Sequence, residues 1–280
     1  MPIFSDLLVT AAGALTSVLT AIILFGIEQY FGFSLYTWSI WFILPIGAIL
    51  AGFAAASGYY FGAKLFNRKP TKVILAYMTL ISAGTYFLIH YLNYYFLQAD
   101  GKMVRDYVPF FSYLAIAIKS TSMQFYIHTR NAASTGELGW FGFVFAGLQI
   151  LGFSAGGLGT YAILAEQPFC DNCSTFLKRS YFKKRYHFGS DEYSQHISKL
   201  VALMKSDNPE EALLEHGKAG REKDTNGYNH QTSMDVRHCE SCHRSWAKLS
   251  LFKQSSNSWN EINDLRTAIY YKRPIHVPKG

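Results

Sequence analysis

The chain has 280 residues, of which 50% are hydrophobic and 16% charged, and its formal net charge is +7. The charge is unevenly distributed, because residues 1–63 contain Asp6 and Glu28 as their only charged side chains. This asymmetry excludes a simple soluble domain and predicts a transmembrane domain, residues 1–165, followed by a soluble domain, residues 166–280. The positive charge follows from such a topology, so it does not argue for a nucleic-acid partner.

Four apolar runs are long enough to cross a bilayer, which takes about 20 helical residues. They cover residues 7–27, 38–61, 73–97 and 138–165. Tyrosine and tryptophan gather at their ends, as they do at the headgroup level of membranes. The chain starts without a basic region or a small-residue cleavage site, so we expect the first run to be a retained span.

Lysine and arginine predict the orientation of these spans. Basic residues cluster on what would be one side of the membrane: Lys64, Arg68, Lys69, Lys72, Lys178, Arg179, Lys183, Lys184 and Arg185. Cytoplasmic ends of spans carry such an excess. We therefore expect an integral protein of the plasma (inner) membrane, with the N-terminus and the C-terminal domain in the cytoplasm.

The segment 107–127 is nearly long enough to be a fifth span. Pro109 lies near its start and Lys119 past its middle, and a central lysine costs about 2.5–3.5 kcal/mol on insertion. We expect an amphipathic piece on the outer surface or a re-entrant piece packed between spans. A fifth span is the alternative.

Small residues recur at four-residue spacing in the second span and again in the fourth. They are Gly47, Ala48, Ala51, Gly52, Ala55, Ala56, Gly152, Gly156 and Gly157. Such stripes let helix backbones approach closely. We expect packing within the bundle, with a homodimer through these faces or a narrow substrate passage as alternatives. The ionisable Glu28 and His90 lie near outer span ends, which disfavours an ion-coupled transporter.

All four cysteines belong to two C-x-x-C pairs, one directly after the fourth span and one in the last fifth of the chain. Two-residue spacing lets both thiolates of a pair face one ion, and four thiolates suit tetrahedral zinc. The sequence predicts one structural zinc site made of Cys170, Cys173, Cys239 and Cys242. The soluble domain resembles a zinc ribbon through these pairs alone.

Three other interpretations share these cysteines. Cys239 to His243 matches the c-type haem attachment pattern, but such haem is attached outside the cytoplasm and the other pair would stay unexplained. A redox-active pair would face an oxidising compartment, and two metal-free pairs are the third alternative. His187, His238 and His243 are substitute metal ligands.

The rest of the soluble domain divides into short segments. Residues 176–188 interleave basic and aromatic side chains, which predicts an anchor to anionic lipid at Lys178, Arg179, Lys183, Lys184 and Arg185. Capping residues and apolar spacing predict a helical insertion, 190–217. The polar stretch 218–235 is expected to be an exposed loop, and residues 259–280 to add an edge strand.

The predicted fold is an all-α membrane bundle, with four transmembrane helices plus one interfacial or re-entrant segment, joined to a small α+β cytoplasmic zinc-ribbon-like domain. A closed four-cysteine site favours a membrane-anchored binding or regulatory module that docks a cytoplasmic protein partner. One alternative is a small-solute transporter or channel lined by spans two and four. Another is a membrane enzyme using 107–127 with His90 and His128, whose spacing identifies no reaction.

Overall fold

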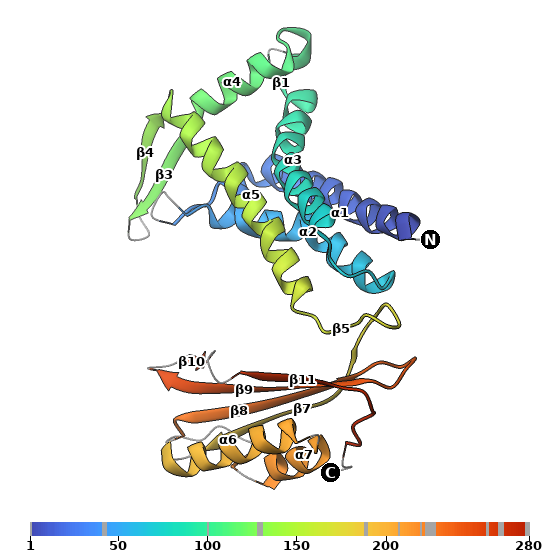
Figure 1. Ribbon diagram of the computed structural model, residues 1–280. Coiled ribbons are helices and arrows are strands. Elements are labelled where there is room, and N and C mark those ends of the chain that lie inside the picture. Colours follow the sequence, from blue (N-terminus) through green and yellow to red (C-terminus); the bar gives the residue numbers. More distant parts are fainter. Residues whose placement is uncertain are drawn as a thin grey trace. The chain divides into compact units, whose positions relative to one another are not determined.

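A computed structural model of the chain describes residues 2–40, 44–99, 101–127, 131–187, 190–206, 208–218, 220–221, 228–255, 258–262 and 266–277. The chain forms two compact units, Met1–Glu166 and Gln167–Gly280. The first consists mainly of helices and the second of an antiparallel sheet with two helices (Figure 1). We call them the helical unit and the sheet unit.

Four long helices dominate the helical unit. They are α1 (Pro2–Phe31), α2 (Ile46–Leu65), α3 (Lys72–Phe96) and α5 (Phe141–Ala165). Each is long and apolar enough to cross a membrane. α3 begins where the Thr71 side chain accepts a hydrogen bond from the Ile74 N–H, a usual N-cap that satisfies an otherwise unpaired donor.

The second long helix begins later than the apolar run 38–61 predicts. Before it the chain forms a 3₁₀ turn, η1 (Leu35–Thr37), which buries Tyr36, and an isolated bridge between Ile40 and Leu44. Pro45 is the N-cap of α2, since proline is tolerated at a helix start but not in its interior. Residues 41–43 lie outside the described part of the chain.

The segment 107–127 is not one continuous element. It contains the short helix α4 (Phe110–Ser120) and then β3 (Ser122–Ile127), which pairs with β4 (Asn131–Glu137). Eleven residues are too few to cross a bilayer, so the described residues contain no fifth span here. Upstream lie the short elements β1 (Gln98–Ala99), β2 (Lys102–Met103) and η2 (Val104–Asp106).

Glycine lets α2 touch its neighbours backbone to backbone. A Cβ on Gly52 would lie 2.3 Å from the Phe153 carbonyl oxygen of α5, and one on Gly58 would lie 2.2 Å from the Ala12 oxygen of α1. Gly156 of α5 approaches α2 equally closely. At these glycines the small-residue faces of α2 are therefore covered by α1 and α5 of the same chain.

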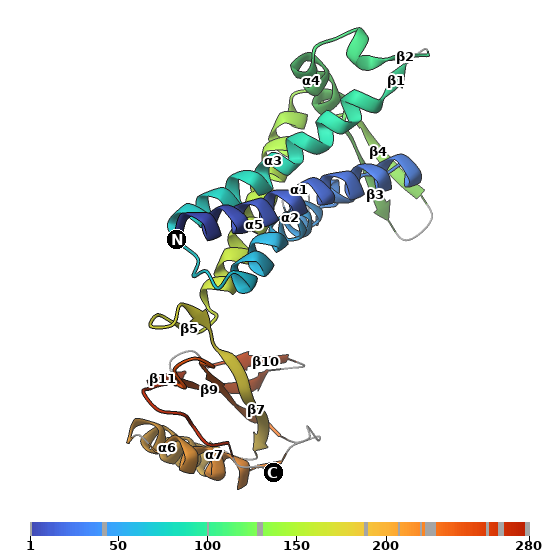
Figure 2. The same cartoon turned by 90° about the vertical axis from the view of Figure 1, so that its right-hand side faces the viewer.

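The sheet unit is built on a five-stranded antiparallel sheet. Its strands are β7 (Lys178–His187), β8 (His230–His238), β9 (Ser245–Ser255), β10 (Ser258–Glu261) and β11 (Thr267–Tyr271), in the order β10-β9-β8-β7 with β11 also paired to β9. Helices α6 (Ser190–Lys205) and α7 (Pro209–Lys218) cover one face of this sheet (Figures 1 and 2). Leu200, Met204 and Leu213 of the helices pack there on Met234 and Leu249.

The expected exposed loop 218–235 is wrong at its C-terminal end. Residues 230–235 belong to β8, which is paired on both sides and buried. Because its side chains are mostly polar, hydrophobic patterning does not predict that this strand is buried. Inside the unit, hydroxyl and imidazole groups form hydrogen bonds with each other. Residues 222–227 lie outside the described part of the chain.

The basic run after the fourth span forms the strand β7. Alternation in β7 sends its side chains to opposite faces of the sheet. Arg185 is buried and donates a hydrogen bond to the Gly217 carbonyl of α7. Arg185 is therefore not available to lipid, whereas Lys184 is exposed.

Candidate metal centre

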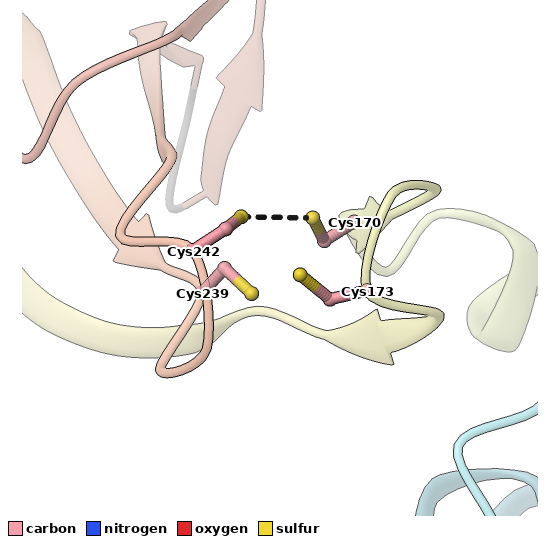
Figure 3. A group of neighbouring side chains, drawn as sticks. All are labelled: Cys170, Cys173, Cys239 and Cys242. Atoms are coloured by element: carbon pink, nitrogen blue, oxygen red, sulfur yellow. Dashed lines mark hydrogen bonds between the residues drawn. The ribbon is translucent and has the colours of Figure 1, made fainter.

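Two hairpin turns bring the four cysteines together. β5 (Phe169–Cys170) pairs with β6 (Thr175–Phe176), and the turn between them carries Cys173. The second pair, Cys239 and Cys242, lies in the turn between β8 and β9. Figure 3 shows the four thiols pointing toward one another from these two turns.

The sulfur positions fit a single tetrahedral ion. All four Sγ atoms lie within 4.8 Å of one another, and those of Cys170 and Cys242 are 3.5 Å apart. A zinc ion with four bonds of about 2.3 Å requires sulfur–sulfur distances of about 3.8 Å, which lies between these values. The cluster can therefore hold a metal ion with small shifts of the side chains.

The two turns share one unusual backbone feature. The residue after each second cysteine, Ser174 or His243, has a left-handed conformation, with φ values of 51° and 57°. In the second turn the Cys239 N–H donates to the Arg244 oxygen and the His243 N–H to the Cys239 oxygen. This sharp reversal aims both thiols of a pair to the same side.

Apolar side chains enclose the cluster. Cys239 is fully buried, Cys170 nearly so, and both pack with Leu177 and Trp246. The Phe169 and Phe176 rings, 5.0 Å apart across the small hairpin, stabilise the first turn. Exclusion of water would strengthen the bonds between these thiolates and a metal ion, and would keep substrates away from it.

The Cys173 and Cys239 thiols have pKa values shifted in opposite directions. Burial raises the pKa of Cys239, but hydrogen bonds from Thr175, Cys242 and Ser241 outweigh burial and lower this pKa to about 6. A hydrogen bond shared with Cys242 raises the pKa of Cys173 to about 12. Cys239 is thus prepared as a thiolate, and a metal ion would displace the remaining protons.

The substitute histidine ligands do not join this group. Among the described residues, the four cysteines are the one set of His, Cys, Asp and Glu side chains close enough to share an ion. His187 instead lies between sheet and helices, where its Nε2 and that of His216 are 3.1 and 3.0 Å from the Thr232 hydroxyl. His196 packs on the His187 ring at 5.3 Å.

This histidine cluster (His187, His196, His216 and His230) is a feature that sequence reasoning missed. Three of its four residues are buried, and its members come from β7, α6, α7 and β8. No local spacing links them, so only the strand and helix positions would have indicated the cluster. A buried histidine is neutral unless an acid pairs with it.

The polar residues of the helical unit form a separate network. Glu28 accepts hydrogen bonds from Ser34 and, at 2.9 Å, from the Asn93 amide, which joins α1 to α3. His90 packs between Tyr36 and Tyr86, with ring centroids 6.2 and 4.6 Å away. His128, the other residue of the expected enzyme site, lies outside the described residues.

Comparisons with known proteins give no family for this chain. No protein-family model, curated protein or solved structure matches it.

Proposed function

We propose that the chain is a membrane-anchored binding or regulatory module. In this proposal the four long helices cross the plasma (inner) membrane, the sheet unit lies in the cytoplasm, and a cytoplasmic protein partner binds it. The observation that supports it best is the convergence of all four cysteines within 4.8 Å. Four thiolates complete a tetrahedral zinc ion and leave no open position for a substrate, which is typical of a structural site.

Zinc would act here as a cross-link. Cys170 follows the end of α5 by a few residues, whereas Cys239 and Cys242 begin the turn into β9. One ion on both turns would fix the chain that leaves the last membrane helix to the central strands of the sheet. The zinc-ribbon resemblance rests on these two turns, and the five-stranded sheet extends well beyond such a module.

Charge supports the proposed orientation. Lys64 lies in the last turn of α2, Arg68 and Lys69 follow this helix, and the exposed bases of β7 follow α5. Both groups would then face the cytoplasm, where anionic lipid attracts them. A free cytoplasmic thiol cluster in a reducing compartment is a metal site more readily than a disulfide.

Two measurements on the full-length protein test the proposal. Elemental analysis of protein purified without added metal should find one zinc per chain, and none in Cys170→Ser or Cys239→Ser. A membrane-impermeant thiol reagent should label these cysteines in opened but not in intact cells, after chelation in both cases. Labelling in intact cells, or absence of zinc, overturns the proposal.

One observation favours a second candidate, a small-solute transporter or channel. The side-chain nitrogen of Gln149 and the hydroxyl of Ser82 are buried in the helical unit without a hydrogen-bond partner among the described residues. Such groups are costly in a bilayer and often mark a polar path. A solute flux in proteoliposomes that Gln149→Leu abolishes, and that Cys239→Ser does not, would decide for this candidate.

A further inference from the structure

The sheet has a second face that α6 and α7 do not cover. The register places Tyr181, Lys183 and Arg185 of β7 beside Val236, Met234 and Thr232, whose side chains face the helices. Because successive side chains of a strand alternate, Phe182, Lys184 and Tyr186 lie on the opposite face. Two of these are exposed: Lys184 and Phe182, the latter by 45%.

Neighbouring strands extend this face with residues of the same kind. Lys248 of β9 lies beside Asp235, the partner of Phe182, and Tyr270 of β11 lies beside Trp246. Tyr270 is 60% exposed. We call this surface the outer sheet face and define it by seven residues of four strands: Arg179, Phe182, Lys184, Tyr186, Arg237, Lys248 and Tyr270.

The outer sheet face is cationic. Arg179 and Arg237 share a single carboxylate, that of Asp235, at 3.0 and 2.9 Å. Lys248 lies 3.6 Å from Glu261. With Lys184, four basic side chains stand against two acidic ones, so the face keeps a positive charge that an anionic partner would neutralise.

The aromatic rings suit a lipid surface better than nucleic-acid bases. Arg179 covers the Phe182 ring at 4.9 Å, and Tyr186 meets Trp259 edge to face at 5.6 Å. Base stacking requires open ring faces, whereas headgroup contact requires only ring edges among cations. The chain between Ala165 of α5 and Lys178 of β7 reaches at most about 45 Å, so the sheet stays within reach of the membrane that α5 enters.

We propose that the outer sheet face binds the anionic headgroup surface of the membrane. This inference rests on the proposed function, because it requires that the long helices span a bilayer. The partner is a phospholipid surface rather than a soluble anion, since the cations and rings are spread over four strands instead of lining a pocket. Docking would leave the helix-covered face of the sheet unit for a protein partner.

The test uses the full-length protein in nanodiscs of phosphatidylcholine alone or mixed with phosphatidylglycerol. A water-soluble amine-acetylating reagent reports the exposure of each lysine by mass spectrometry. Lys184 should be modified several-fold more slowly in the anionic discs, and high salt should remove this protection. Lys205, exposed at the end of α6, is the internal reference and should react equally in both discs.

Variants separate docking from other causes of protection. Phe182→Ser with Tyr270→Ser should restore the reactivity of Lys184 in anionic discs, whereas Leu214→Ser, at an exposed site of α7, should not. Equal reactivity of Lys184 in both discs overturns the inference. Protection by a single-stranded oligonucleotide in phosphatidylcholine discs overturns it in favour of nucleic acid. Neither result affects the zinc content or thiol labelling, which test the proposed function separately.

Discussion

The interiors of the two units are packed by different means. In the helical unit, glycines without a side chain let helix backbones touch, as at Gly52 and Gly156. In the sheet unit, polar groups enter the interior in pairs, as with His216 and Thr232. Where lipid surrounds a bundle, apolar burial gives helices little reason to associate and close packing replaces it. Where water surrounds a small domain, buried polar groups must be paired, and a metal supplements a small core.

The largest expected difference between the two units is their response to removal of the proposed zinc ion. Structural zinc stabilises small domains by about 10 kcal/mol or more, which is comparable with the whole stability of a domain. Chelation, or Cys239→Ser, should therefore unfold the sheet unit and leave α1, α2, α3 and α5 folded. Hydrogen exchange on the full chain in detergent measures both units at once, and a sheet unit that stays protected after chelation would contradict the cross-link.

A matched pair of alanine substitutions probes the helical interior. Gly52→Ala places a methyl group 2.3 Å from the Phe153 oxygen, whereas Gly84→Ala meets nothing within 4 Å. We expect Gly52→Ala to lose about 3 kcal/mol through overpacking and Gly84→Ala to gain up to about 1 kcal/mol from helix propensity. Denaturation in a mild detergent compares them; equal effects would mean that α2 and α5 are not in backbone contact.

The same contrast explains which parts of the structure the sequence predicts. Crossing a bilayer takes about 20 apolar helical residues, and the predicted spans 7–27, 73–97 and 138–165 each coincide with a long helix. The exception is 38–61, because composition alone does not show that the chain turns before Pro45. The four cysteines were identified because their spacing reflects the chemistry of one ion, and the structure brings them together.

In the sheet unit the predictions fail where burial is polar. β8 is an inner strand of the sheet, yet Gln231, Thr232 and Ser233 give it the composition of a loop. In β7 the sequence did not distinguish Arg185, which is buried, from Lys184, which is exposed, because alternation between two faces becomes meaningful only when the strand is known. Such pairing depends on contacts distant in sequence, which periodicity does not contain.

Acid should unfold the sheet unit before the helical unit. Burial lowers the pKa of His187 to about 4, helped by His196, His230 and Arg185, and lowers that of His216 to about 3. Because both values lie below the ordinary 6.5, the unfolded chain binds these protons first, and stability falls as pH drops from about 6.5 toward 4. Above pH 7 the histidines are neutral in both states and contribute no such slope.

The pH effect has its own control variants. Each depressed histidine contributes at most about 1.4 kcal/mol per pH unit, so His216→Gln should reduce the pH dependence of the unfolding temperature by a measurable part. His276→Gln, at an exposed site, should leave it unchanged. Both variants keep the cysteines, so zinc release at low pH is common to them. Identical slopes would show that His216 is not buried in a neutral form.

The smallest expected effect comes from the left-handed residues of the two turns that carry the cysteines. The helical unit also has a left-handed residue, Asn67. Ser174 and His243 hold φ values of 51° and 57°, and Asn67, just after α2, has a φ of 51°. Left-handed backbone costs an ordinary residue about 1 kcal/mol or more, whereas glycine adopts it freely and asparagine with little cost. Ser174→Gly and His243→Gly should therefore tighten zinc retention by roughly fivefold each, and Asn67→Gly should change stability little.

Competition with a chromogenic chelator measures this retention, because folding of the turns and metal binding are coupled. Ser241→Gly is the matched control: it lies in the same turn without a positive φ among the described backbone angles, so glycine there should weaken retention slightly by freeing the unfolded chain. If all three glycine variants lose zinc faster, the turns do not use the left-handed conformation. In that case the two cysteine pairs would be held by the surrounding sheet rather than by their own backbone.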